Sequence, residues 1–140
     1  MKGRPFFDTN VLIYAALTPA DPRAEPARVL LGQGGLISVQ VLNEFIHTAR
    51  YKFRQPWNQV LETIADIREL CPTVTPLTVE VGEHGLAIAQ RYGYHLWDAL
   101  VIAAALEASC DTLYSEDMQD GQKIEGMRIR NPFRGQDEVL

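Results

Sequence analysis

Three aspartates stand where α/β proteins commonly gather their chemistry. Asp8 ends a short aromatic run near the start of the chain, and Asp117 lies just past the apolar run 112–115. If both runs are strands, the two carboxylates face the crevice beyond the strand ends, where ligands bind in open α/β sheets. Asp98 interrupts the apolar stretch 97–109 near its start, so a helix there would hold a carboxylate rigidly in its first turn. Converging carboxylates repel one another without a cation, and an all-oxygen ligand set favours Mg²⁺ or Mn²⁺ over zinc.

Each of these acids also has a purely structural explanation. Asp8 suits a helix N-cap, and Asp98 suits the positive end of a helix dipole. Asp117 lies in a polar loop where acids and glycine form turns, and the neighbouring Glu116 and Asp120 compete with it for any inward position. The residues alone leave these alternatives open, so the case for a site depends on the acids as a set.

The elements that would position the acids are strands separated by helices. Short apolar runs predict strands at 4–8, 36–39, 73–75, 112–115 and 127–130, the last alternating apolar and charged residues like an exposed edge strand. Helical periodicity predicts helices at 10–17, 24–31, 40–53, 56–71, 78–92 and 97–109, the last apolar all round and therefore central. This order predicts an α/β sandwich in which helices flank a mainly parallel central sheet.

Composition limits the class of protein. The chain has 140 residues, 46% of them hydrophobic and 22% charged, which suits one globular domain with a polar tail from about Pro132. The net charge of −5 disfavours a protein that holds nucleic acid by bulk charge alone. The most apolar stretch, 97–106, is about half of the ~20 residues that a membrane span needs, and no secretory signal is recognisable. We therefore expect a cytoplasmic protein in which Cys71 and Cys110 are reduced thiols.

Four motifs occur in order along the chain: FDTNVLIY at 7–14, VLNEF at 41–45, LWDALVIAAA at 96–105 and LYSEDM at 113–118. This ordered set resembles the PIN-domain ribonucleases, in particular the VapC-type toxins of bacterial toxin–antitoxin pairs. The resemblance extends over nearly the whole chain and implies a single PIN-like domain, residues 1–140.

The resemblance also implies a ligand set for the metal. Helical periodicity gives Glu44 no role, but the second motif places it with the three aspartates as a ligand of Mg²⁺ or Mn²⁺. The implied ligands and catalytic residues are thus Asp8, Glu44, Asp98 and Asp117. Asn10 and Ser115 match polar positions that commonly support such a site, and Asp120 is a candidate outer ligand.

The implied activity is hydrolysis of RNA phosphodiester bonds by a water that the metal activates. The implied partners are the RNA substrate, a cognate antitoxin and a second copy of the chain. Arg50, Lys52 and Arg54, interleaved with aromatic residues, are candidate RNA contacts, although a solvated helix end is the simpler explanation of these cations. His84 and His95 have no evident partner and are expected to be structural.

Other functions fit the sequence less well. A response-regulator receiver would have paired acids after its first strand and a late lysine, whereas only Asp8 follows that strand here and Lys123 lies in a predicted loop. An aspartyl phosphatase would have a second acid two residues after the first, and Asn10 occupies that place. The remaining alternatives are a PIN-fold RNA-processing nuclease that is not a toxin and a partner-binding module without enzymatic activity.

Overall fold

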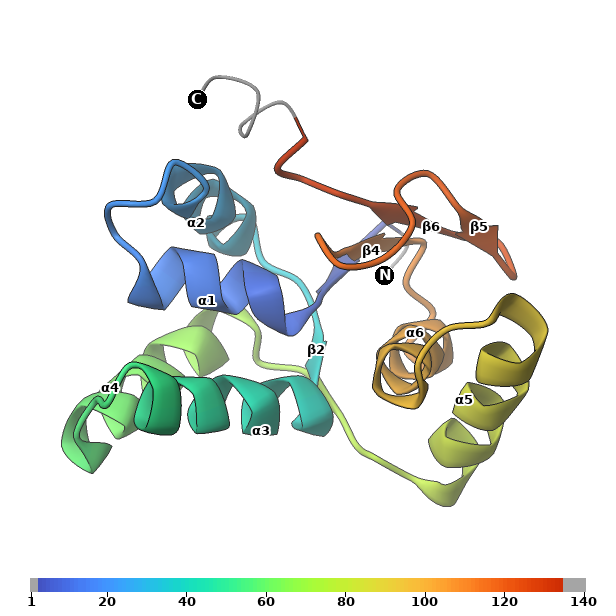
Figure 1. Cartoon of the computed structure of the whole chain (residues 1–140), viewed down its shortest axis with the longest axis horizontal. Helices are drawn as coiled ribbons and strands as arrows, with labels where there is room; N and C mark the ends of the chain where they lie inside the picture. The colour runs from blue at the N-terminus through green and yellow to red at the C-terminus, as the bar shows by residue number, and fades with distance from the viewer. Residues whose placement is uncertain (1–2, 135–140) are drawn as a thin grey trace.

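A computed structural model describes residues 3–134 (Figure 1). Strands and helices alternate over most of the chain, as the sequence predicted. In chain order the elements are β1 (Pro5–Phe7), α1 (Thr9–Leu17), α2 (Ala24–Gly32), β2 (Ile37–Ser38), α3 (Val39–His47), η1 (Thr48–Lys52), α4 (Trp57–Leu70), β3 (Val74–Thr75), α5 (Val79–Tyr92), α6 (Leu96–Glu107), β4 (Thr112–Tyr114), β5 (Lys123–Ile124) and β6 (Met127–Arg130). In this part of the chain no helix is long and apolar enough to cross a membrane.

The strands form a mainly parallel sheet, which confirms the predicted fold class. Four strands pair in the order β1-β4-β6-β5, and only the β5–β6 pair is antiparallel. Strands β2 and β3 pair in parallel, and a parallel bridge between Phe6 and Leu36 continues the sheet from β1 towards β2. The carboxyl ends of β1, β2 and β4 therefore lie at one edge of the sheet, where the functional residues are expected.

Helix α6 is central and buried, as its apolar sequence predicted. Every residue from Ala99 to Ala105 is buried, so the helix is anchored in the core and holds the half-buried Asp98 in its first turn. Helix α5 packs alongside α6 (Figure 1). Gly85 makes this close approach possible, since a Cβ at that position would lie 2.6 Å from a side-chain carbon of Leu100.

The structure corrects three details of the predicted fold. The helix predicted over 40–53 ends at His47, and a π-helical turn follows over Thr48–Lys52. Strand β6 is not at the edge, because Lys123 and Ile124 form β5 outside it rather than a loop. This hairpin closes through Glu125 and Gly126, both with positive φ, a backbone that suits a two-residue hairpin turn.

The third correction concerns the predicted loose tail from Pro132. Phe133 is buried and packs edge-on against Tyr14, with ring centroids 5.0 Å apart. Asn131 holds this segment in place by accepting a hydrogen bond from the Phe133 backbone N–H at 2.9 Å. The segment up to Arg134 is therefore docked on α1, and the remainder of the predicted tail lies outside the described residues.

Candidate active site

Asp8 is fixed where β1 meets α1. Because Phe7 pairs with Tyr114 in the parallel β1–β4 ladder, Asp8 and Ser115 both follow directly on paired strand ends. One carboxylate oxygen of Asp8 caps α1 by accepting from the Thr9 N–H at 2.7 Å. The other accepts from the Ser115 hydroxyl at 2.7 Å. The N-cap explanation of Asp8 is thus confirmed, and its second oxygen is held by Ser115 at the neighbouring strand end.

Asn10 and Ser115 join Asp8 to Asp117. The Asn10 amide donates to Asp117 at 3.1 Å and approaches Asp8 at 3.4 Å. The Ser115 hydroxyl accepts from the Asp117 N–H at 3.2 Å, and the Asn10 carbonyl accepts from the Glu116 N–H at 3.2 Å. The loop after β4 is therefore held against the first turn of α1, with the Asp117 carboxylate turned towards Asp8.

Glu44 and Asp98 come from different helices and complete the group of acids. Asp98 lies in the first turn of α6, and Glu44 lies on the exposed side of α3. The Gln40 side-chain amide connects their two helices, donating to Glu44 at 3.2 Å and to the Trp97 carbonyl at 2.9 Å. Gln40 itself is buried, and neither periodicity nor any motif had indicated its role.

The four acids act on one another electrostatically. Burial raises the pKa of Asp8 from 3.8 to about 7, the Ser115 and Thr9 hydrogen bonds oppose this rise, and the charges of Asp117 and Asp98 add to it. Burial also raises the pKa of Glu44, with the charges of Asp98 and Asp117 contributing. The pKa of Asp98 is raised by burial and then by Asp117. Each carboxylate is therefore within electrostatic reach of others in the set, although they are dispersed through the sequence.

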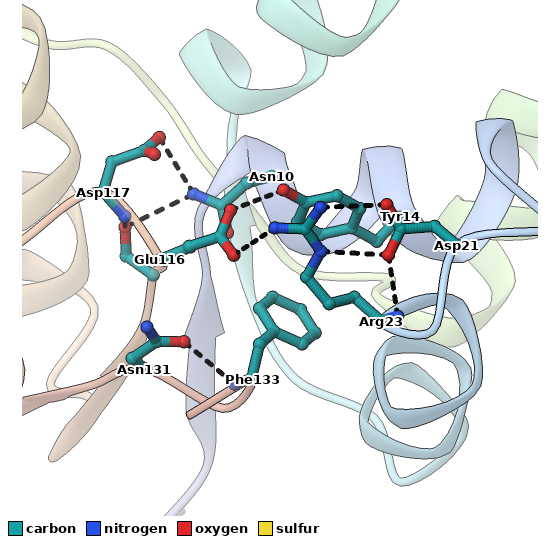
Figure 2. Close-up of polar contacts among 9 residues, drawn as sticks. Asn10, Tyr14, Asp21, Arg23, Glu116, Asp117, Asn131 and Phe133 are labelled. Atoms are coloured by element: carbon teal, nitrogen blue, oxygen red, sulfur yellow. Dashed lines mark hydrogen bonds and ion pairs between the residues drawn. The ribbon is translucent and has the colours of Figure 1, made fainter. Parts of the chain in front are cut away.

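The structure distinguishes Asp117 from the two acids that compete with it. Glu116 turns away, accepting from the Tyr14 hydroxyl and pairing with Arg23 at 2.8 Å (Figure 2). The guanidinium of Arg23 also pairs with Asp21 at 2.9 Å and lies 4.2 Å from the centre of the Tyr14 ring. This network neutralises the acid next to Asp117 and fixes the loop that carries it.

Asp120 lies outside the group as well. One of its oxygens accepts from the Asn131 N–H at 2.8 Å, and the other pairs with Arg134 at 3.0 Å. The structure thus brings Asn10 and Ser115 to the acids but engages Asp120 with the segment after β6. Arg50 and Lys52 lie in η1, directly after the helix that carries Glu44, and Arg54 lies just beyond η1.

The donor set fits a hard divalent cation. All four charged groups offer oxygen, and a cation beside the buried Asp8 would stabilise its carboxylate and so oppose the rise in its pKa. The buried Thr9 hydroxyl, which interacts with Glu44, is a further oxygen next to Asp8. Among the described residues, no three His, Cys, Asp or Glu side chains lie close enough in this conformation to hold an ion.

The family of the chain follows from its sequence. The model of the PIN domain matches residues 6–120, which include all four acids. The chain belongs to the PIN domain family. No curated protein sequence matches this PIN domain significantly.

Solved structures with the same fold include several toxin–antitoxin proteins. A toxin–antitoxin complex from Klebsiella pneumoniae is 21% identical with a TM-score of 0.68, covering 91% of this PIN domain and 97% of the matched chain. DNA-bound VapBC from Salmonella typhimurium is 17% identical with a TM-score of 0.67, and the match covers 93% of this chain and 98% of the matched chain. VapC20 from Mycobacterium tuberculosis, a toxin that cleaves the sarcin–ricin loop, is 17% identical with a TM-score of 0.66, covering 81% and 91%. At these identities the likeness shows a shared fold.

Proposed function

We propose that this PIN domain is a Mg²⁺- or Mn²⁺-dependent endoribonuclease and the toxin of a toxin–antitoxin pair. The observation that carries the proposal is that Asp8, Glu44, Asp98 and Asp117, from different elements, lie within electrostatic reach of others in the set, and that burial raises the pKa of Asp8 to about 7. Buried carboxylates that repel one another are costly unless a cation binds them. The structural neighbours that are toxins or toxin–antitoxin complexes support the biological role.

In this proposal Asp8, Glu44, Asp98 and Asp117 hold the metal. A bound divalent cation would lower the pKa of a water molecule and stabilise charge on the phosphate. Ser115 and the Thr9 N–H orient the Asp8 carboxylate by fixing one oxygen each. Asn10 positions the Asp117 carboxylate by donating a hydrogen bond to it. Gln40 positions Glu44 relative to the start of α6 by donating to Glu44 and to the Trp97 carbonyl. The product would be an RNA cut at a phosphodiester bond by hydrolysis.

We propose that an antitoxin and a second copy of this chain are its protein partners. The antitoxin follows from the toxin–antitoxin complexes that share the fold. A homodimer remains a prediction that a mass measurement in solution tests. The expected location is the cytoplasm, where RNA and an antitoxin would both be available.

The test of the proposed activity is cleavage of a defined RNA by the purified protein. We expect cleavage with Mg²⁺ or Mn²⁺, none with EDTA, and 5′-phosphate ends on the products. Asp98→Asn is expected to remove activity, whereas Asp111→Asn, an exposed acid outside the group, is expected to retain it. Full activity of a folded Asp98→Asn protein would refute the proposed site.

A further inference from the structure

A line of aromatic and basic side chains begins next to Glu44 and follows α3 and η1 away from the acids. Glu44, His47 and Tyr51 are spaced by three and four residues, so they share one helical face. The rings of His47 and Tyr51 lie 5.0 Å apart between centroids. Beyond Tyr51 the chain reverses into α4, whose first residue is Trp57 (Figure 1). The line is thus continuous from the proposed metal site to the start of α4.

An open pocket of about 690 Å³ lies at the end of this line nearest the acids. Glu44 and His47 line it together with Trp97, whose side chain is 56% exposed beside Asp98. The pocket shares Glu44 with the acid group, so a molecule that filled it would lie directly next to the proposed reaction centre. Its volume is in the range of small-ligand sites.

The far end of the line combines cations with exposed rings. The guanidinium of Arg50 lies 5.8 Å from the centre of the Tyr51 ring and 5.2 Å from that of Trp57. Tyr51 is 62% exposed and Trp57 is 50% exposed. Lys52 lies over the Phe53 ring at 5.8 Å. Within residues 3–134, Arg50 and Lys52 make no ion pair, so their charges are available to an anion.

We propose that these side chains form a track for single-stranded RNA leading to the metal site. The track consists of Trp97, His47, Tyr51, Trp57, Arg50 and Lys52. Exposed rings beside cations suit a single strand, because bases stack on the rings while the cations contact phosphates. From Glu44 to Tyr51 the helix rises about 10 Å, which is about three steps at the 3.4 Å spacing of stacked bases.

The inference rests on the proposed function for the identity of the strand, but its binding test needs no catalysis. Both tryptophans of the chain, Trp57 and Trp97, belong to the track, so intrinsic tryptophan fluorescence reports on nothing else. A fluorescein-labelled oligouridine of about 12 nucleotides would be titrated in EDTA, where no cleavage occurs. We expect the oligouridine to quench the tryptophan fluorescence of the wild type. Trp57→Phe and Trp97→Phe each leave one tryptophan, so quenching in both variants would show that both ends of the track bind.

Variants of exposed residues test the track without disturbing the core. We expect Tyr51→Ala and Trp57→Ala each to weaken oligouridine binding about tenfold, with Trp57→Phe retaining most of it. Arg50→Ala should lower the slope of log affinity against log salt by about 0.7, the contribution of one phosphate contact on a single strand. Arg91→Ala is the matched control, since Arg91 also lies over a ring, that of Tyr92, but on α5.

Cleavage kinetics separate the track from the active site. For long RNA we expect Tyr51→Ala and Trp57→Ala to raise KM with little change in kcat, and for a dinucleotide we expect no effect on either. Equal effects on both substrates, or binding that falls no more than in Arg91→Ala, would overturn the track. So would a change of oligomeric mass in the ring variants, since the surface would then be a contact with a second copy. If oligouridine binds along the track but no RNA is cut with metal, the proposed activity fails and the track stands.

Discussion

The raised pKa of Asp8 predicts that this buried carboxylate lowers the stability of the metal-free wild-type protein. Replacing Asp8 by Asn removes a buried charge that folding makes unfavourable. The pKa of this carboxyl rises from 3.8 to about 7 on folding, so about three pK units at 1.36 kcal/mol each correspond to about 4 kcal/mol. Asn retains only one carbonyl acceptor for the Ser115 and Thr9 donors, and losing one charge-assisted hydrogen bond costs about 1.5–3 kcal/mol. We therefore expect metal-free Asp8→Asn protein to be about 1–2.5 kcal/mol more stable at pH 8.

The sign of the pH dependence follows from the direction of this shift. Between pH 3.8 and about 7 the folded state binds the Asp8 proton more tightly than the unfolded state. The stability contribution of Asp8 is therefore lost as pH rises through this window. Urea unfolding in EDTA from pH 4 to 8 would measure the difference between wild type and Asp8→Asn. Parallel stability profiles of the two proteins would refute the assignment of this shift to Asp8.

Four further predictions follow from the same contacts. Ser115→Ala removes a charge-assisted donor to Asp8 worth about 1.5–3 kcal/mol, so the acidic limb of the cleavage–pH profile should move up by about one to two units; an unmoved limb would contradict this role. Arg23→Ala should remove the cation that neutralises Glu116 and loosen the loop that carries Asp117, lowering Mn²⁺ affinity by about 10-fold, with Arg23→Lys restoring part of it in a calorimetric titration. Hydrogen bonds to Glu125 and Glu107 raise the pKa of His84. These contacts therefore contribute stability below pH 6.5, and that contribution is lost as pH rises through the raised pKa of His84. His84→Gln should cost about 0.5–1 kcal/mol at pH 6 and less at pH 9, as urea unfolding would measure. Mn²⁺ at 100 times its Kd should stabilise the wild type by about 2.7 kcal/mol and Asp8→Asn far less, as thermal unfolding would measure.

Local sequence signals were sufficient to place Asp8 and Asp98 within their elements. Both lie at the boundary of a strongly apolar element, so periodicity placed them at a strand end and in a first helical turn. Glu44 could be found only through resemblance, because it lies on the polar side of α3 and interacts with acids from other elements. Hydrophobic periodicity describes which face is buried, and therefore carries no information about a polar face that meets another helix.

The choice between Glu116, Asp117 and Asp120 depends on contacts distant in sequence. Arg23 and Glu116 are 93 residues apart, and no local pattern indicates that they pair. Strand β5 was missed for a similar reason, since its two residues form a strand only when a tight turn lays them beside β6. Contacts between residues distant in sequence therefore determine which acid of this loop is free of an ion pair with the described residues and which strand forms the edge of the sheet.

The central claim is that Asp8, Glu44, Asp98 and Asp117 together bind a divalent cation. Calorimetric titration of Mn²⁺ into the protein tests it most directly, with Asp98→Asn as the disrupted site and Asp120→Asn as the matched control. We expect saturable binding in the wild type, unchanged binding in Asp120→Asn, and a loss of more than about tenfold in Asp98→Asn. Absence of saturable binding in the wild type, or equal affinities of the wild type and a folded Asp98→Asn protein, would contradict the claim.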